Sequence, residues 1–458
     1  MFLLLVSGSL TTTGMFMDGL IYSNVAANIA EGVGSFWNPT YTATHHPEFY
    51  QHPPLMMGML AGFYKLLGVH LWVTKLYMVV TTLLCAWLTV RLWTRLGGKK
   101  ENGWMPLLFW TLMPVVTRFA NQCMIENTML LFDLGAILLL LRKNRGIMYA
   151  LIAGLLVAAA FMTKGFVGLF PLALPFLLWL FDRKNETVKS MAIKTVAMLV
   201  GLIAPLAVIA LAVPQSREYF NNYMQYQVLA GWARNEDARW QIVVYFLRNV
   251  AIVAGLVTVV ALVKKSVQRP TQRQWAMWAL VACAVLPIMV STRQNEYYVL
   301  PAMPLFAVLS ALLVEEAVGG WLKPSKAMAY GSLSMLAGSL LLNALRFGSE
   351  GRDVQLQRDM KLIVAHLDEG ETISIPTPLY CNYKLQGYYY REHRVTLDDM
   401  HRCRHFLTTG EYKPDSSYRE VPLPTEEYKL YELAVSGQRL AVGSQRAAVG
   451  GQRAAVSS

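Results

Sequence analysis

Long apolar runs separated by short polar clusters recur along most of this chain. An apolar run of about 20 residues is long enough to cross a bilayer as a helix. The runs predict spans, several of them short, at 1–17, 72–90, 105–120, 127–141, 147–162, 166–181, 192–213, 241–263, 274–291, 297–315 and 326–346. We therefore expect an all-α polytopic membrane protein with about 11 to 13 transmembrane helices.

Basic residues gather in clusters that recur after every second span. The clusters begin at Arg91, Arg142, Arg183, Lys264 and Lys323. All of them therefore fall on one side of the membrane, which the positive-inside rule makes cytoplasmic. The extracytoplasmic side receives the loop 18–71, the turns near 121–126 and 163–165, the loop 214–240 and everything after about residue 346.

The composition supports this topology. The 458 residues are 55% hydrophobic and 15% charged, whereas soluble domains average about 25% charged residues. The net charge of +12 taken alone would suggest nucleic acid, but the basic residues lie in short clusters between spans, as they do in cytoplasmic loops. We therefore expect a membrane partner and no nucleic-acid partner. Cys381 and Cys403 share one polar region and could pair if that region lies outside the cell.

The chain divides into three parts. Residues 1–346 form the predicted transmembrane domain, with its first extracytoplasmic loop at 18–71. Residues 347–432 are polar and contain the strand-like stretches TISI and GYYY, which predict a small extracytoplasmic α/β or α+β domain. Residues 433–458 repeat with a period of seven. Ala and Val beside Gly and Ser are too small for a coiled-coil seam, so we expect a disordered heptapeptide-repeat tail.

The first extracytoplasmic loop carries candidate chemistry. Asp18 lies at the mouth of the first span and is expected to cap a helix over 19–30. The stretch EFYQHPPL then starts a second helix at Pro53 and Pro54. The apolar run that follows is too short to span, so we place it in the membrane interface. His52 lies beside this helix N-terminus, which favours anions such as phosphate.

Histidines and an acidic residue in the same loop leave the cofactor open. His46 and Glu48 could hold a divalent metal. The alternative is that the loop histidines are solvated. The need for a metal therefore stays undecided at this point.

Four further extracytoplasmic segments place charged residues on the same face. Glu126 begins a span, where an ionisable residue is costly and therefore a functional candidate, with a helix cap as the alternative. Lys164 lies in a tight hairpin with Gly165 at the bend, on the side where the positive-inside rule predicts no lysine. Phosphate binding explains this lysine, with snorkelling as the alternative. The segment STRQNEYYVLP and the loop 215–240 add Arg293, Glu296, Tyr297, Tyr298 and Arg234.

Together these segments form an ordered set with a family resemblance. The set is an acidic residue ending the first span, a long loop finishing in QHPPL, a second acidic residue starting a later span, FMTKGF, and YYVLPAMPLFAVL. Over residues 1–346 it resembles the GT-C type polyprenyl-phosphate-sugar glycosyltransferases. The most similar group is the aminoarabinose (lipid A) transferases and the protein O-mannosyltransferases. The resemblance implies a GT-C-like fold and transfer of a sugar from a polyprenyl phosphate such as undecaprenyl phosphate, usually with inversion.

The resemblance also implies roles for individual residues. Asp18 matches the essential carboxylate of the first loop and Glu126 the second acidic position, so both are expected to be catalytic. His52 and Gln51 stand where the aminoarabinose transferases have a phosphate-binding Lys and a Glu that helps to hold a metal. The expected substrate-binding residues are Tyr22, His52, Lys164 and Tyr298 from the motifs, with Arg234 or Arg293 helping to hold the leaving phosphate.

The predicted function is sugar transfer from a polyprenyl phosphate to a hydroxyl of a lipid, glycan or protein on the extracytoplasmic face, with Asp18 as general base. The alternative is a membrane transporter or lipid flippase, although the spans show no internal repeat. The sequon at Asn185 lies on the predicted cytoplasmic side, which favours a bacterial inner membrane over the endoplasmic reticulum. Because His52 stands in place of a permanent cation, we also expect activity to fall as pH rises through its pKa.

Overall fold

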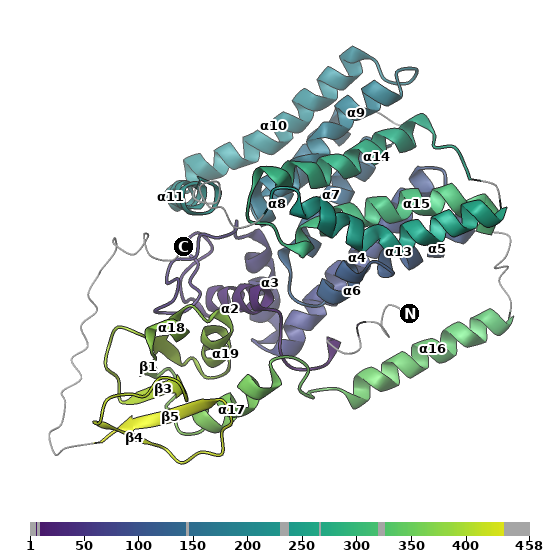
Figure 1. Cartoon of the computed structure of the whole chain (residues 1–458). Helices are drawn as coiled ribbons and strands as arrows, with labels where there is room; N and C mark the ends of the chain where they lie inside the picture. Colours follow the sequence, from purple (N-terminus) through teal and green to yellow (C-terminus); the bar gives the residue numbers. More distant parts are fainter. Residues whose placement is uncertain are drawn as a thin grey trace. The chain divides into compact units, whose positions relative to one another are not determined.

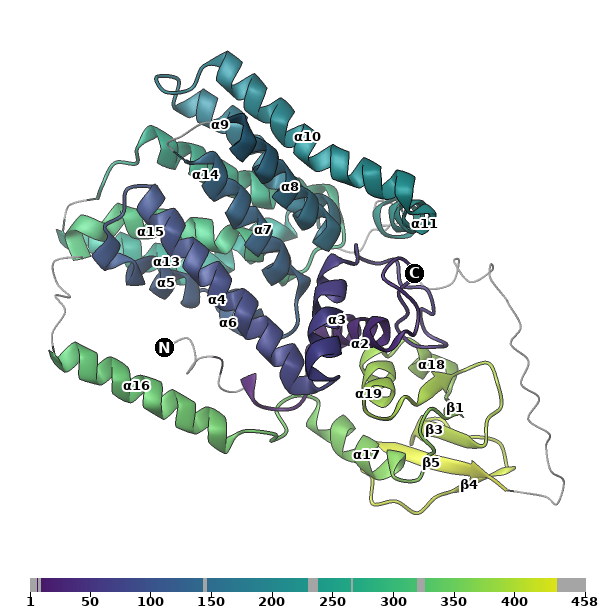
Figure 2. The same ribbon diagram turned by 180° about the vertical axis from the view of Figure 1, so that it is seen from behind.

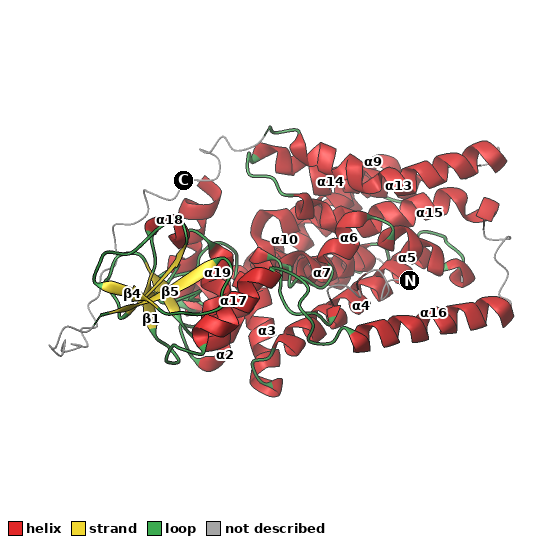
Figure 3. Ribbon diagram, turned by 60° about the horizontal axis from the view of Figure 1, so that its bottom comes forward, coloured by secondary structure: helices red, strands yellow, loops and turns green. Residues whose placement is uncertain are grey.

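The computed structural model describes residues 6, 10–142, 146–229, 238–264, 267–318 and 326–434. They belong to two compact units, Met1–Val354 and Gln355–Ser458, whereas the sequence predicted the boundary at 346/347. Helices make up the first unit and the second carries a sheet (Figure 3). Residues 1–5 and 7–9 of the predicted span 1–17, the substrate-binding candidate Arg234 and the repeat tail after residue 434 lie outside the described residues.

Long helices run side by side through the first unit (Figure 1). All its helical elements, short 3-10 and π segments included, are α2 Met17–Glu31, α3 Leu55–Leu67, α4 Leu71–Arg95, η1 Lys100–Asn102, α5 Trp104–Thr111, α6 Pro114–Phe119, α7 Ile125–Leu140, α8 Ile147–Lys164, η2 Gly165–Ala173, α9 Leu174–Phe181, α10 Val188–Ala212, α11 Pro214–Asn222, η3 Tyr223–Leu229, α13 Gln241–Lys264, α14 Gln272–Val285, η4 Leu286–Val290, η5 Glu296–Ala302, α15 Met303–Val318 and α16 Lys326–Leu345.

Six stretches of the described chain are long and apolar enough to cross a membrane. They are Leu71–Arg95, Ile147–Phe181, Val188–Ala212, Gln241–Lys264, Gln272–Val290 and Glu296–Val318. Large apolar side chains on these helices remain exposed, which suits a hydrocarbon environment rather than water. The predicted polytopic all-α membrane protein is therefore confirmed.

The stretch Ile147–Phe181 folds back on itself. α8 ends at Lys164, and Gly165 follows with φ 73° and ψ −140°, a conformation open essentially to glycine alone. The backbone of Gly168 then lies against Ala160, since a Cβ on Gly168 would come within 2.8 Å of the Ala160 carbonyl carbon. The predicted hairpin with its bend at Gly165 is confirmed, and it contains two helical arms.

The predicted span 105–120 is broken in two. α5 ends at Thr111, and α6 begins at Pro114, whose ring and missing N–H prevent a continuous helix. The side chain of Asn249 in α13 accepts a hydrogen bond from the Val115 N–H at 2.7 Å and so satisfies a donor at the start of α6. The break turns α6 toward the end of the unit that carries α2 and α3 (Figure 2).

Glycines let α8 and α10 approach closely. A Cβ on Gly154 would lie 2.1 Å from the Met198 carbonyl oxygen, and one on Gly201 would lie 2.2 Å from the Leu151 carbonyl oxygen. Small residues of this kind allow membrane helices to pack backbone against backbone. The contact fixes α8, which ends at Lys164.

The second unit is a small mixed sheet with helices. Its strands are β1 Thr372–Ser374, β2 Thr396–Asp398, β3 His405–Thr409, β4 Tyr418–Glu420 and β5 Tyr428–Leu433, in the order β2-β1-β3-β5-β4. β1 pairs in parallel with β2 and β3, and the other pairs are antiparallel. The helices are α17 Val354–Val364, α18 Thr377–Tyr380 and α19 Tyr383–His393. The predicted small domain with helices and strands is confirmed.

One local prediction in this unit is wrong, and one open possibility is not realised. TISI contributes β1, but GYYY lies in α19, where the Asn382 side chain caps the helix by accepting from the Leu385 N–H at 3.1 Å. The tyrosines are buried in that helix, so tertiary packing overrides their strand propensity. Cys381 and Cys403 are both free thiols, so the open disulfide prediction is not realised.

The glycine contact between α8 and α10 can be tested by one methyl group. We expect Gly154→Ala to destabilise the protein by about 1–3 kcal/mol, because the methyl would collide with backbone that cannot yield. Thermal unfolding in detergent measures the effect. Gly255→Ala in α13 is the matched control, since nothing lies within 4 Å of its Cβ. Equal melting temperatures for the two variants would contradict the close packing.

Candidate active site

The first turn of α2 is fixed against the turn that precedes α7. The Phe16 N–H donates to the Gln122 Oε1 at 2.8 Å. Gly19 packs so tightly on the Gln122 carbonyl that a Cβ there would lie 1.7 Å from the oxygen. Phe16, and not Asp18, is the N-cap residue, and it makes no side-chain cap, so the predicted capping role of Asp18 is wrong. The carboxylate of Asp18 is instead available to the site.

Asp18 is a half-buried carboxylate held by a tyrosine. The Tyr297 hydroxyl donates to its Oδ2 at 2.5 Å. Burial raises the pKa of Asp18 above its usual range, although the Tyr297 hydrogen bond and the positive charges of Lys164 and Arg293 act in the opposite direction. A raised pKa makes a carboxylate a better proton acceptor, which suits a general base.

Lys164 and Glu126 form a buried ion pair beside Asp18. Glu126 lies in the first turn of α7 and Lys164 at the bend between α8 and η2, and their side chains are 0% and 3% exposed. The Lys164 ammonium also lies 4.1 Å from the ring centroid of Tyr298 and 5.3 Å from that of Tyr297, as in cation–π contacts. The second carboxylate oxygen of Glu126, Oε2, has no hydrogen-bond partner among the described residues.

His52 lines the site as a neutral side chain. Its carbonyl accepts a hydrogen bond from the Tyr219 hydroxyl of α11, and its ring meets the Tyr22 ring edge-to-face at 5.6 Å. Burial and the positive charges of Lys164 and Arg293 lower the pKa of His52 to about 3. In the free protein His52 is therefore neutral rather than the expected pH-dependent cation, whereas the expected fall in activity with rising pH stays a prediction. A neutral imidazole still donates one hydrogen bond.

The other predicted substrate-binding residues meet in the same cluster. Arg293 is exposed, and its charge acts on Asp18, Tyr22 and His52. Tyr298 covers Lys164. Tyr297 is the contact that sequence reasoning missed. It is next to Tyr298 in the chain, and only the turn of η5 shows which of the two reaches Asp18.

The described part of the chain contains no group of three or more His, Cys, Asp or Glu side chains placed to hold a metal. Glu48 is exposed, and the His46 ring lies 4.6 Å from the His45 ring. His46 and Glu48 therefore form no three-ligand site of this kind. The metal assignment gains no support from the geometry.

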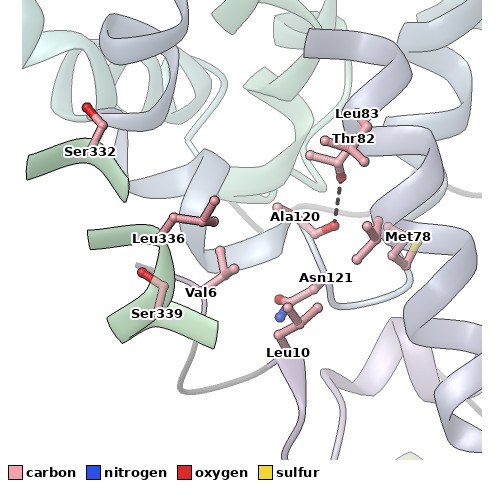
Figure 4. Close-up of a pocket in the computed structure, with 11 residues that line it drawn as sticks. Val6, Leu10, Met78, Thr82, Leu83, Ala120, Asn121, Ser332, Leu336 and Ser339 are labelled. Carbon is pink, nitrogen blue, oxygen red and sulfur yellow. Dashed lines mark hydrogen bonds between the residues drawn. The ribbon is translucent and has the colours of Figure 1, made fainter. Parts of the chain in front are cut away.

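An apolar pocket of about 430 Å³ lies close to the contacts that hold α2. α4 contributes Met78, Val79, Thr82 and Leu83 to its wall, and the other lining residues are Val6, Leu10, Ala120, Asn121, Ser332, Leu336 and Ser339 (Figure 4). The Thr82 hydroxyl donates to the Ala120 carbonyl at 3.3 Å, so this part of the polar wall is already satisfied. Asn121 directly precedes Gln122, which contacts both Phe16 and Gly19.

Comparisons with known proteins identify the fold. A family model described as dolichyl-phosphate-mannose-protein mannosyltransferase matches residues 51–210. No curated protein sequence matches the chain. The crystal structure of ArnT from Cupriavidus metallidurans bound to undecaprenyl phosphate superimposes with a TM-score of 0.68 at 13% identity, covering 95% of this chain and 96% of that one. The apo structure gives 0.62 at 14% identity, covering 94% and 96%.

A more distant match is the archaeal oligosaccharyltransferase AglB from Archaeoglobus fulgidus, in complex with an inhibitory peptide and a dolichol-phosphate. Its TM-score is 0.51 at 10% identity, covering 86% of this chain and 65% of that one. The chain has the GT-C fold. The resemblance predicted from the sequence is thereby confirmed. Within this GT-C fold, the region matched by the family model contains His52, Glu126 and Lys164, whereas Asp18 and Tyr297 lie outside it.

The ion pair can be tested by removing one partner and then both. We expect Lys164→Met to destabilise the protein by about 3–5 kcal/mol, because it leaves Glu126 buried without its countercharge. Adding Glu126→Gln should recover a large part of the lost melting temperature, since the charge is then gone. A double variant as unstable as Lys164→Met would contradict the pairing.

The neutral state of His52 predicts an acid-dependent stability. In the unfolded chain His52 binds a proton below its usual pKa of 6.5, whereas in the folded protein His52 stays neutral down to about pH 3. Stability therefore falls as pH drops through this window, by at most about 2 kcal/mol at about pH 5. Between about pH 7.5 and about pH 5, the melting temperature of His52→Gln should decrease less than that of the wild type. His70→Gln, at an exposed histidine, is the control. Equal decreases in melting temperature for the wild type and His52→Gln would contradict a neutral His52.

Proposed function

We propose that this protein transfers a sugar from a polyprenyl phosphate to a hydroxyl acceptor, at the extracytoplasmic face of a bacterial inner membrane. The observation that carries the proposal is one cluster in which a carboxylate of raised pKa, Asp18, lies beside a buried cation and an exposed one, Lys164 and Arg293. A sugar phosphate needs a base for the incoming hydroxyl and positive charge for the leaving phosphate. The ArnT-like fold and the mannosyltransferase family match support the same reaction class.

The reaction would be a single displacement at the anomeric carbon of the sugar. The acceptor oxygen forms a bond to that carbon while the bond to the phosphate oxygen breaks, and the phosphate leaves with the electron pair. Asp18 takes the proton of the acceptor hydroxyl through its carboxylate. Attack opposite the leaving group inverts the configuration of the sugar. No oxidant or reductant is required.

The leaving phosphate gains negative charge as the bond breaks, so cations and hydrogen-bond donors favour the transition state. Arg293 is the exposed cation of the cluster and the neutral His52 ring can donate one hydrogen bond. Lys164 adds positive charge from behind the tyrosine rings, partly offset by Glu126. We assign phosphate binding to Arg293 and His52, with Lys164 as electrostatic support.

Glu126 is assigned to the electrostatic support of the site. Its Oε1 accepts from Lys164, while Oε2 is buried and has no hydrogen-bond partner among the described residues. Because the side chain is 0% exposed, Glu126 acts by holding the Lys164 ammonium rather than by touching a substrate. The apolar pocket beside α4 suits the hydrocarbon chain of a lipid substrate, since its wall offers few polar groups.

The test is transfer from a radiolabelled polyprenyl-phosphate sugar by purified protein in detergent. Asp18→Asn keeps the shape of the side chain and removes the base, so transfer should fall by about 100-fold or more. Glu48→Gln, an exposed acid of the same loop, is the matched control and should retain wild-type transfer. Near-wild-type transfer by Asp18→Asn would overturn the assignment. Movement of label into sealed vesicles without covalent transfer would indicate a transporter instead.

A further inference from the structure

Tyr297 is buried, hydrogen-bonded to Asp18 and packed between two phenylalanine rings. The residue is 8% exposed, and its hydroxyl donates to the Asp18 Oδ2 at 2.5 Å. Its ring meets the rings of Phe16 and Phe119 edge-to-face, at centroid distances of 5.8 and 5.4 Å. These ring contacts pack the side chain on two sides and support the position from which its hydroxyl reaches the Asp18 carboxylate.

The residue before Tyr297 is anchored to two other helices. Glu296 begins η5, and its side chain is 12% exposed. Its carboxylate pairs with Arg118 of α6 and with Arg248 of α13, the latter at 2.7 Å, and it accepts from the Asn249 side chain at 2.9 Å. Both arginines are more than half exposed, so the charge attraction is screened. The three contacts nevertheless fix where η5 starts and thus which tyrosine faces Asp18.

We propose that Tyr297 is a positioning residue that orients the Asp18 carboxylate, and that Glu296 holds Tyr297 in place through Arg118 and Arg248. The hydrogen bond occupies Oδ2 and leaves Oδ1 to receive the acceptor proton. This inference rests on the proposed function, because it assigns Tyr297 a task in the reaction of Asp18. It gives a role to a tyrosine that lies in the YYVLP motif but was not among the predicted substrate-binding residues, which included Tyr298.

The hydrogen bond also sets the pH at which Asp18 becomes a base. The groups that act on Asp18 or share its cluster are Tyr297 and Tyr298 from η5, Arg293 from the preceding segment, Lys164 from α8, Glu126 from α7, Tyr22 from α2 and His52 from the first loop. Among them, Tyr297 is the one whose side-chain hydrogen bond lowers the pKa of Asp18. Without this hydrogen bond, less opposes the effect of burial, so the pKa of Asp18 rises further.

The experiment is the pH profile of kcat/KM for sugar transfer, whose acidic limb reports the base of the free enzyme. A hydrogen bond to a charged group corresponds to about one pKa unit, so Tyr297→Phe should move the acidic limb about one pH unit upward. Glu296→Gln should move it in the same direction. The double variant should match Tyr297→Phe, because Glu296 acts through Tyr297. Tyr330→Phe, at an exposed tyrosine of α16, should leave the profile unchanged.

An acidic limb that stays in place in Tyr297→Phe would overturn the proposal. If that variant does not fold, an unmoved limb in Glu296→Gln does the same. Shifts that add in the double variant would overturn the part played by Glu296. The Asp18→Asn assay separates these results from failure of the proposed function. An active Asp18→Asn protein defeats the function itself, whereas an inactive one with an unmoved Tyr297→Phe limb defeats only the present inference.

Discussion

The buried ion pair between Lys164 and Glu126 is the interaction on which the site depends. Two charges removed from water are costly, and the cost of separating them is a large share of the roughly 5–15 kcal/mol that stabilises a folded domain. The pair therefore ties the first turn of α7 to the end of α8. It also places a positive charge within electrostatic reach of Asp18 without exposing that charge to solvent.

Everything else in the cluster is arranged around this fixed point by packing between distant segments. The close contact at the glycines of α8 and α10 fixes the position of α8 against α10, and therefore the position of Lys164 at the end of α8. The turn before α7 receives the first turn of α2, so Asp18 and Glu126 share one support at Gln122. η5 then closes the cluster through Tyr297, which joins parts of the chain that lie 279 positions apart. The helices form the scaffold, and the candidate site lies where the starts of α2, α7 and η5 meet the end of α8.

The sequence predicted most of this arrangement because each component leaves a local trace. Apolar length and charge alternation predicted the spans and their common face, and a glycine after a misplaced lysine predicted the hairpin at Gly165. Glu126 was recognised as an ionisable residue that is costly at the start of a span, and Lys164 as a lysine on the side where the positive-inside rule predicts none. Asp18 was assigned through the family resemblance.

What the sequence could not show is which atoms meet. Two adjacent tyrosines are equivalent until the turn of η5 is known, so Tyr298 was chosen and Tyr297 was missed. Burial and neighbouring cations make His52 neutral, and neither can be read from the motif QHPPL. Lys164 was expected to face a phosphate, whereas the structure gives it Glu126 as its direct partner.

The most direct test of the account is an experimental structure of the protein with a polyprenyl phosphate bound. We expect the phosphate to lie within hydrogen-bond reach of the His52 ring and the Arg293 guanidinium, in the cluster that contains Asp18, with the Lys164–Glu126 pair intact behind it. A phosphate held elsewhere on the protein, with Asp18 and Arg293 remote from it, would contradict the central claim that this cluster is the transfer site.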